Sequence, residues 1–340
     1  MERAPYCETV STSPVEALSP SDSGDNGDRE YILAKVRATL ASPENTDVAA
    51  GQHIGRFLVI NKVGHGGMGA VYAAYDEQLD RKVAVKVMRV EGLPTEDDRQ
   101  RFVREAQALA RVSHPNVVTI HEVGKANGAL FLATEFLQGQ HLGEWQRTNP
   151  GWRAIVGAYV QAGRGLAAVH EEGLIHRDFK PSNAMRTTTG IVKVLDFGLA
   201  RYTDATSAAE TQTAGDSTPS ATSSLTQTGV VIGTPAYMSP EQHEGLKVDA
   251  RSDQYSFCVA LWEALAGARP FTETTLGQMS QAKSGGPPPW PSGGVPLPRR
   301  LADVLRRGLS PSPDDRWPSL DALLEHLAWD PDKRRNRGAT

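Results

Sequence analysis

The positions from residue 57 to residue 90 alternate between β-branched or aliphatic side chains and polar ones. Two turn signals, at residues 64–69 and 76–81, interrupt this alternation. A period of two residues is typical of strands with one buried face, and glycine or aspartate clusters mark the turns between them. The pattern therefore predicts three antiparallel strands.

The next segment, residues 95–112, has the pattern of an amphipathic helix. Thr95 can cap its start, and acidic residues follow where the helix dipole favours them. The apolar side chains that share one face are Phe102, Ala106, Leu109 and Ala110. Strand patterns return at residues 117–124 and 129–137, and the signal is predominantly helical from Gly139 onward. A strand-rich part followed by a helical part predicts an α+β protein with two lobes.

Segments of low apolar content flank and interrupt this pattern. Residues 1–53 are rich in Ser, Pro, Asp and Gly, so we expect a flexible tail, in which residues 28–40 form either a docking helix or a transient one. Residues 203–228 hold thirteen Ser or Thr in 26 positions and are expected to form a flexible loop. Residues 284–298 are expected to form a loop stiffened by proline.

Composition narrows the class of protein. The chain carries 36 basic and 40 acidic residues, a balance that gives no basic field for nucleic acid. Its two cysteines, Cys7 and Cys258, are too few for a disulfide framework and favour a reducing compartment. No signal peptide or apolar run of membrane-spanning length is evident. We therefore expect a cytoplasmic location, no membrane span and no nucleic-acid partner.

A glycine-rich motif lies between the first two predicted strands. Gly64, Gly66 and Gly69 have the spacing G-x-G-x-x-G. Glycine lets backbone N–H groups approach phosphate oxygens without interference from a Cβ atom. The same spacing also serves dinucleotide folds and ordinary hairpins, but here it leads into a strand and not into a helix.

A charged residue interrupts the apolar strand that follows. Lys86 lies between Val85 and Val87, where an ammonium is costly unless it finds an anion or reaches solvent at a sheet edge. Glu105, on or beside the apolar face of the predicted helix, is the candidate partner. Without such a partner, the lysine is expected to extend to solvent.

The stretch "LIHRDFKPSNAM", residues 174–185, concentrates chemistry between apolar residues. Asp196 follows another apolar run, and a hairpin would bring it close to Asn183. An amide and a carboxylate oxygen can together hold Mg²⁺. Asp178 could then accept a proton and Lys180 could neutralise charge. A surface charge cluster would explain any one of these residues, but not their joint order.

Taken together, these motifs resemble serine/threonine protein kinases, most of all the bacterial eukaryotic-like (Hanks-type) family. The motifs are "GHGGMGAVY", "VAVK", "HRDFKPSN", "DFG" and "GTPAYMSPEQ". The resemblance implies a bilobal kinase fold, with a small β-rich N-lobe that has one helix and a larger helical C-lobe. The implied boundaries are a tail at 1–53, a kinase domain at 54–328 (N-lobe 54–134, hinge 135–140, C-lobe 141–328, activation segment 196–241) and a basic tail at 329–340.

The resemblance also implies ATP with Mg²⁺ or Mn²⁺. Lys86, paired with Glu105, would hold phosphates, and Asn183 and Asp196 would bind the metal ions. Asp178 would orient the attacking hydroxyl and accept its proton, with Lys180 on the phosphoryl group and Thr234 supporting Asp178. The implied nucleotide-binding residues are Val63, Gly64, Gly66, Gly67, Gly69, Val71, Ala84, Lys86, Thr134, Glu135, Leu137 and Met185.

The implied substrates are proteins with Ser or Thr acceptors, docked at "GTPAYMSPEQ". Glu241 and Arg316 would form a buried pair. Arg177 would bind a phosphate on the activation loop, placed by autophosphorylation at Thr226 or Thr228, and transient dimerisation would serve that reaction in trans. Two alternatives remain open: a pseudokinase scaffold that binds partner proteins, and a small-molecule phosphotransferase on a related fold.

Overall fold

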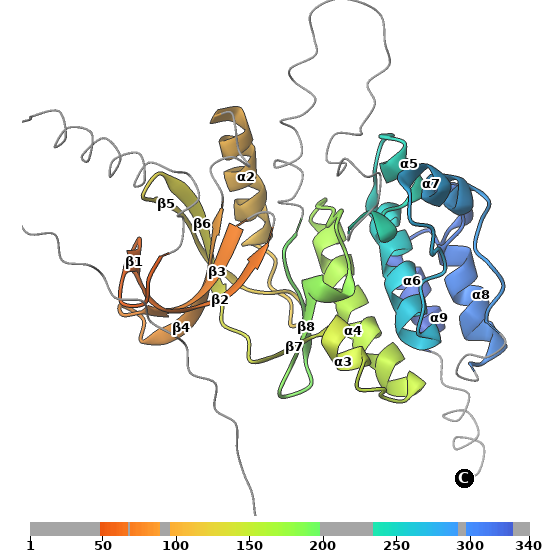
Figure 1. The fold of residues 1–340 in the computed structure, drawn as a ribbon, viewed down its shortest axis with the longest axis horizontal. Coiled ribbons are helices and arrows are strands. Elements are labelled where there is room, and N and C mark those ends of the chain that lie inside the picture. The colour runs from red at the N-terminus through yellow and green to blue at the C-terminus, as the bar shows by residue number, and fades with distance from the viewer. Residues whose placement is uncertain (1–47, 67–68, 89–95, 198–233, 292–296, 329–340) are drawn as a thin grey trace, which may run out of the picture. The chain divides into compact units, whose positions relative to one another are not determined.

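A computed structural model of the chain describes residues 48–66, 69–88, 96–197, 234–291 and 297–328. These described residues all belong to one compact unit. Figure 1 shows their strands and helices. Among the helices of the described residues, none combines the length and apolar character needed to cross a bilayer.

The N-terminal part is a six-stranded antiparallel sheet in the order β1-β2-β3-β4-β6-β5. Its strands are β1 (His53–Ile54), β2 (Phe57–Gly66), β3 (Gly69–Asp76), β4 (Arg81–Met88), β5 (Ile120–Ala126) and β6 (Ala129–Glu135). Strands β2, β3 and β4 are the three predicted from the alternating pattern. That part of the prediction is confirmed, because eight to ten residues per strand leave the period legible.

The two faces of this sheet differ in burial. Side chains such as Tyr72, Val83 and Val85 form a buried core on one face. Along β4, Ala84 and Lys86 alternate with these residues and are only half-buried. The strand register places Val71 opposite Lys86, and Ala84 opposite Thr134, so these residues share the second face. That face remains partly open.

Helix α2 (Glu96–Leu109) follows β4 in the chain, as the amphipathic pattern predicts. Phe102, Ala106 and Leu109 are buried, but Ala110 is exposed, so its assignment to the core face is wrong. The helix ends at Leu109, and the chain turns away before Ala110 can pack. Thr95, the predicted cap, lies outside the described residues.

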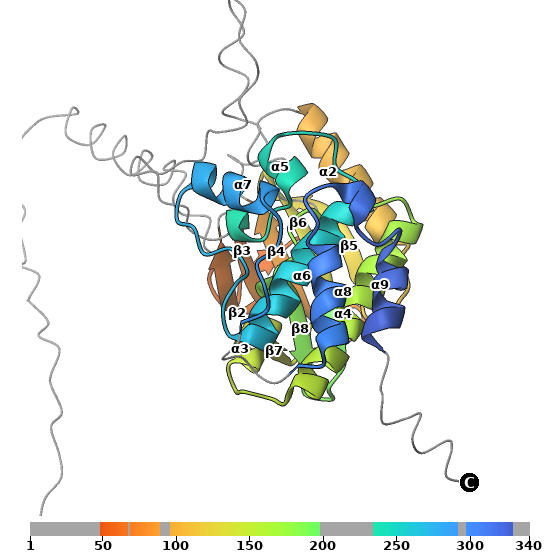
Figure 2. The same ribbon diagram turned by 90° about the vertical axis from the view of Figure 1, so that its right-hand side faces the viewer.

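The C-terminal part is mainly helical. Its α-helices are α3 (Leu142–Gln146), α4 (Trp152–Glu171), α5 (Pro240–His243), α6 (Ala250–Ala266), α7 (Leu276–Ser284), α8 (Arg299–Gly308) and α9 (Leu320–Leu327). Figure 2 shows α4, α6, α8 and α9 side by side, and the contacts between these helices agree. Helix α6 is buried over nearly its whole length, so it forms the centre of this part.

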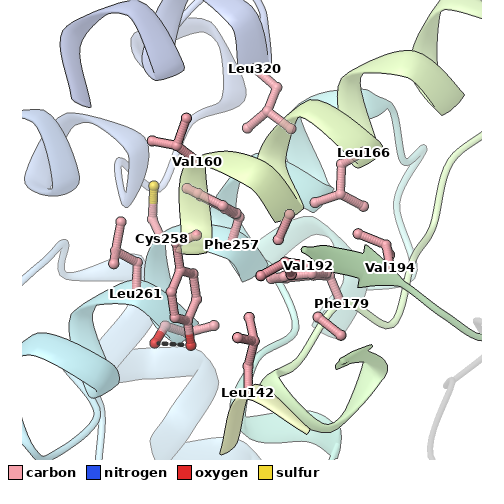
Figure 3. Close-up of a cluster of buried hydrophobic side chains, with 14 of the residues drawn as sticks. Leu142, Val160, Leu166, Phe179, Val192, Val194, Phe257, Cys258, Leu261 and Leu320 are labelled. Atoms are coloured by element: carbon pink, nitrogen blue, oxygen red, sulfur yellow. Dashed lines mark hydrogen bonds between the residues drawn. The ribbon is translucent and has the colours of Figure 1, made fainter. Parts of the chain in front are cut away.

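Side chains from several elements fill this centre (Figure 3). Phe257 and Leu261 of α6, Val160 of α4 and Phe179 from the loop before β8 are all buried. Val192 and Val194 join them from a short strand. The loop that carries the charged stretch 174–185 is therefore attached to the core by an apolar residue of its own, Phe179, whose side chain is fully buried.

The chain is predominantly helical from Gly139 onward, as predicted, but this part also contains a three-stranded antiparallel sheet. It consists of β7 (Gly139–His141), β8 (Ala184–Thr187) and β9 (Val192–Val194), in that order. Strands of three or four residues are too short for a period of two to stand out in the sequence. Strands β8 and β9 form a hairpin, and it is this hairpin that positions the candidate site.

Backbone and side-chain bonds join β9 to the sheet-bearing part. Val194 donates to the Asn116 carbonyl (2.9 Å) and accepts from the Val118 N–H (3.0 Å). The Glu135 carboxylate accepts from Lys193 Nζ (2.7 Å) and from the Thr119 N–H (2.8 Å). Desolvation raises the pKa of Glu135, but these two donors outweigh it and leave that pKa lowered. Glu135, the first residue of the predicted hinge, is therefore held in place by Lys193 and Thr119.

Candidate active site

An ion pair connects the two parts of the molecule at the half-open sheet face. Lys86 Nζ on β4 lies 2.7 Å from Oδ1 of Asp196, two residues after β9. Desolvation raises the pKa of Asp196, but the charges of Lys86, His176 and Lys180 outweigh it and leave that pKa below its ordinary value. The Asp196 side chain is 41% exposed, so the carboxylate can still take a further partner.

A second cluster surrounds Asp178, which is almost fully buried. Lys180 Nζ lies 2.8 Å from Asp178 Oδ2. Asn183 Nδ2 donates to the Asp178 carbonyl (2.8 Å) and to Oδ2 (3.2 Å). The three side chains predicted as catalytic acid-base, cation and metal ligand therefore meet in one place. The Asp178 carboxylate accepts from two side-chain donors, Lys180 and Asn183.

The hairpin β8–β9 brings Asn183 next to the segment that carries Asp196, as predicted. Asn183 ends the 3₁₀ turn Pro181–Asn183 directly before β8, and its carbonyl accepts from the Leu195 N–H (2.8 Å). Because the Nδ2 atom of Asn183 donates to Asp178, its Oδ1 oxygen is the atom available to a cation. An amide oxygen and a partly exposed carboxylate form a donor set that suits Mg²⁺ or Mn²⁺.

One buried carboxylate, Asp253 on α6, supports the loop that carries Asp178. It accepts from the backbone N–H groups of His176 and Arg177 (both 2.7 Å) and bonds with His170 Nε2 (2.7 Å). Burial raises the pKa of Asp253, but its bonds with His170 and His176 outweigh that effect and leave the pKa lowered. Sequence reasoning missed this residue, because an acid near a helix start is more often a solvated cap.

Two non-glycine residues of the site adopt the left-handed backbone region. Arg177 has φ +65° and Asp196 has φ +51°. Such conformations cost about 1–3 kcal/mol each and persist only where the surroundings enforce them. At Arg177, Asp253 binds the N–H and Gln242 Nε2 donates to the carbonyl (2.8 Å). Bonds to both sides of the residue thus fix the chain just before Asp178.

His176 links this loop to the end of β9. Its Nδ1 accepts from the Asp178 N–H (3.3 Å), so Nε2 is the donor to the Leu195 carbonyl (2.9 Å). The buried ring also lies near those of Phe179 (5.9 Å between centroids) and Phe197 (4.8 Å). The loop with Asp178 and the segment with Asp196 are therefore held together by an imidazole that sequence reasoning did not single out.

Some of the residues predicted to bind a nucleotide share the half-open sheet face. Val71, Ala84 and Thr134 share that face, and Met185 is half-buried on β8. Val63 is 50% exposed. At Gly69, with φ +150°, an added Cβ would lie 1.9 Å from the Val87 carbonyl oxygen, so only glycine fits. The other predicted residues that the structure describes are Gly64, Gly66, Glu135 and Leu137.

Some predicted site residues are not brought into the cluster by any described contact. Glu105 is half-buried on α2, and its pairing with Lys86 stays a prediction. Thr234 begins a 3₁₀ turn (Thr234–Ala236), but its side chain is outside what the structure describes. Gly67, Thr226 and Thr228 also lie outside the described residues.

The predicted buried pair is confirmed. Arg316 donates to both carboxylate oxygens of Glu241 at 2.8 Å, and Ser252 Oγ donates to Oε1. Arg316 also donates to the carbonyls of Ser310, Pro311 and Arg251. The two bonds from Arg316 to Glu241 attach α5 to the segment that carries Arg316.

Comparison with known proteins gives consistent results. A family profile described as "Protein kinase domain" matches residues 57–327. Serine/threonine-protein kinase pkn3 of Myxococcus xanthus is 38% identical over 307 residues, which cover 86% of this chain and 53% of that protein. Serine/threonine-protein kinase Pkn1 of the same organism is 34% identical, over 84% of this chain and 39% of that protein. The chain thus spans about half of these relatives' length, or less.

Solved structures show the same architecture. The crystal structure of the Mycobacterium tuberculosis PknI kinase domain matches with a TM-score of 0.62 at 26% identity, over 83% of this chain and 98% of that one. This likeness confirms the predicted fold class, a β-rich N-terminal lobe with one helix and a larger helical C-terminal lobe.

Proposed function

Because this chain belongs to the protein kinase family, we propose that it is an active enzyme that transfers the γ-phosphoryl group of ATP to serine and threonine hydroxyls of proteins. Membership of this family implies ATP as the phosphoryl donor and a divalent metal ion as a cofactor. The observation that supports activity most directly is the convergence of Lys180 (2.8 Å) and Asn183 (3.2 Å) on the Asp178 carboxylate, together with the Lys86–Asp196 pair.

These side chains divide the chemistry among them. The substrate hydroxyl oxygen forms a bond to the γ-phosphorus as the bond from that phosphorus to the ADP oxygen breaks, and the hydroxyl proton passes to Asp178. Lys180, 2.8 Å from Asp178, brings a positive charge to the group in transfer. Lys86, at the half-open sheet face, would hold the phosphates that remain on the nucleotide.

Asn183 and Asp196 would hold the divalent ion, which when bound neutralises the charge of the phosphates. The hairpin β8–β9 and the His176 bonds keep these two ligands near Asp178 without help from a nucleotide. Catalysis of this type depends on positioning and electrostatics, and this chain supplies both through buried, hydrogen-bonded side chains.

The finer parts of the proposal are autophosphorylation and a role in signal transduction. The acceptors Thr226 and Thr228 precede the segment 235–238, which we infer to be the docking site for protein substrates. That segment ends at α5, whose Gln242 contacts the carbonyl of Arg177 beside Asp178. A docked peptide would therefore lie against the loop that accepts its proton.

The alternative is a pseudokinase scaffold, which binds partners but transfers nothing. To separate the two, purified chain is incubated with γ-labelled ATP, Mg²⁺ and a Ser/Thr peptide library, and the labelled amino acids are identified. We expect label on Ser and Thr. We also expect Asp178→Asn to lower transfer by a factor of about 10²–10⁴ while thermal stabilisation by ATP persists. Equal transfer by both proteins would refute the role of Asp178, and no transfer by the wild type would favour the scaffold.

A further inference from the structure

Lys283 is a fully buried lysine far along the chain from the residues discussed so far. It lies in the last turn of α7 (Leu276–Ser284), and its relative exposure is 0%. A buried ammonium is costly unless all of its donors find acceptors. A side chain of this kind in the last turn of a helix therefore calls for a specific explanation.

The acceptors of Lys283 lie almost entirely in the segment before α5. Its Nζ atom lies 3.1 Å from the Pro235 carbonyl oxygen, 3.2 Å from that of Ala236 and 2.6 Å from that of Met238. His243 Nε2, at the end of α5, is 3.0 Å away. One ammonium thus has four acceptors for its three N–H donors.

Two other sets of side-chain hydrogen bonds hold the segment before α5 among the described residues. The Tyr237 hydroxyl donates to Glu263 (2.6 Å), and Ser239 and Gln242 form a capping box at the start of α5. Neither of these contacts involves the carbonyl oxygens of Pro235, Ala236 and Met238, which lie within 3.2 Å of Lys283 Nζ. If the Lys283 charge were removed, these carbonyls would remain buried with no ammonium donor.

We propose that Lys283 is a positioning residue for protein substrates: its ammonium fixes the backbone of residues 235–238, and with it the surface on which the substrate docks. This inference rests on the proposed function, which places docking at that segment. Through Gln242, whose Nε2 donates to the Arg177 carbonyl, the segment also borders the loop with Asp178.

The charge state of Lys283 allows a second, independent test of the inference. Burial and the charge of Arg269 lower the pKa of Lys283 to about 7, with Glu273 opposing. The other groups that face it are Tyr255 of α6, whose ring centroid lies 5.9 Å away, and His243 of α5. Burial and Lys283 lower the pKa of His243 to about 4, so His243 does not titrate near neutrality.

The first test compares Lys283→Met with wild type and with the control Lys247→Met, whose lysine is exposed on the loop between α5 and α6. The KM for a peptide substrate, the KM for ATP and the peptide-independent hydrolysis of ATP are measured. We expect Lys283→Met to raise the peptide KM by about tenfold or more, with both ATP quantities unchanged. An unchanged peptide KM would overturn the proposal. Similar impairment of peptide binding, ATP binding and ATP hydrolysis would also overturn it, because it would show a merely structural lysine.

The second test needs no variant that loses a buried charge. In the wild type, the peptide KM is measured from pH 6 to pH 8.5. We expect it to rise as the ammonium loses its proton near pH 7, whereas the KM for ATP stays constant. In Lys283→Arg the guanidinium remains charged, so the peptide KM should not follow pH. The same pH profile in both proteins would contradict the inference. Absence of any Asp178-dependent transfer would instead refute the proposed function itself.

Discussion

The Nζ atom of Lys86 lies 2.7 Å from Oδ1 of Asp196, a residue 110 positions further along the chain. This contact joins the half-open face of the six-stranded sheet to the end of the β8–β9 hairpin. It places the charge that would hold phosphates next to the carboxylate that would hold a metal ion. A single ion pair therefore couples the two halves of the proposed site.

Replacement of Lys86 by Met tests this coupling. The methionine keeps most of the apolar stem but removes the ammonium, so we expect kcat for peptide phosphorylation to fall by a factor of about 10² or more, because phosphate positioning is lost. The melting temperature should change little, because the Asp196 carboxylate that loses its partner is 41% exposed and can be solvated by water. The matched control is Lys82→Met on the same strand, where the lysine is exposed. Equal loss in both variants would show that the strand, and not the charge, is responsible.

Replacement of Asp253 by Asn tests the support of the loop that carries Asp178. One carboxylate oxygen becomes an N–H₂ donor that faces the backbone N–H groups of His176 and Arg177 or the ring of His170. We expect a loss of about 1–3 kcal/mol in the free energy of unfolding and a fall in kcat of about tenfold or more, with the KM for ATP unchanged.

The control for Asp253→Asn is Asp249→Asn at the start of the same helix. Asp249 caps α6 by accepting from the Arg251 N–H (2.7 Å), and asparagine caps helices equally well. Steady-state kinetics and urea unfolding of both variants distinguish the two roles. A normal kcat in Asp253→Asn would mean that Asp253 stabilises the fold without positioning Asp178.

The fold was predictable where local patterns are long. Strands β2 to β4 and helix α2 each present several periods of alternation or helical spacing, and these elements were identified from sequence. A hairpin between Asn183 and Asp196 was expected from the motif residues, but the bounds of β8 and β9 and the whole of β7 were not. Strands of three or four residues carry no recognisable period, and β7 pairs with a strand distant in sequence. The motif residues around Asp178 were identified because their order within a few positions is itself informative.

Residues whose role depends on tertiary burial were not predictable. Asp253 and Lys283 look like ordinary solvated charges on helices, and only the packing of α6 and α7 reveals that both are fully buried and hydrogen-bonded. The sequence suggested Glu105 as a partner of Lys86, because it lies on or beside the apolar face of its helix, and this pairing stays a prediction; the sequence did not suggest Asp196. The contact with Asp196 requires the two lobes to meet, which no local pattern reports.

The pair Glu241–Arg316 predicts a large effect on stability. Removal of Arg316 leaves a buried carboxylate without its main partner, so Arg316→Ala should lower the free energy of unfolding by about 3–5 kcal/mol. Arg299→Ala, at an exposed position on α8, is the control and should have little effect. Urea unfolding monitored by circular dichroism measures both. A loss below about 1 kcal/mol would show that water or another residue replaces the guanidinium.

The same pair predicts a dependence on acid. Burial raises the pKa of Glu241, but the bonds from Arg316 and Ser252 outweigh it and lower the pKa from 4.5 to about 2. Because the folded-state pKa is depressed, the stabilisation is present above about pH 4.5 and is lost as the pH falls toward 2. In Glu241→Gln this component is absent. We therefore expect unfolding free energies measured at pH 6 and pH 3 to differ more in wild type than in Glu241→Gln.

The prediction that phosphorylation controls activity depends on Arg177. Its backbone is held on both sides, by Asp253 and by Gln242, while its Nε atom is buried and has no hydrogen-bond partner among the described residues. A phosphate brings nearly two negative charges and three acceptor oxygens, enough for charge-assisted bonds to such a guanidinium. Within the Ser/Thr-rich stretch 203–228, the acceptors nearest in sequence to the proposed docking segment are Thr226 and Thr228, which lie outside the described residues.

We therefore expect the purified chain to autophosphorylate within residues 222–228. Replacement of Thr226 and Thr228 together by Ala, or of Arg177 by Ala, should lower peptide phosphorylation to a similar low level, and the triple variant should be no worse, because all three act through one contact. The control is Thr203→Ala with Thr211→Ala, earlier in the same Ser/Thr-rich stretch. Mass spectrometry locates the phosphates, and phosphatase treatment of the wild type should reproduce the loss. Full activity in the Thr226/Thr228 variant, with no phosphate found in residues 203–228, would mean that the stretch is a surface insertion and that the buried Nε of Arg177 serves another partner.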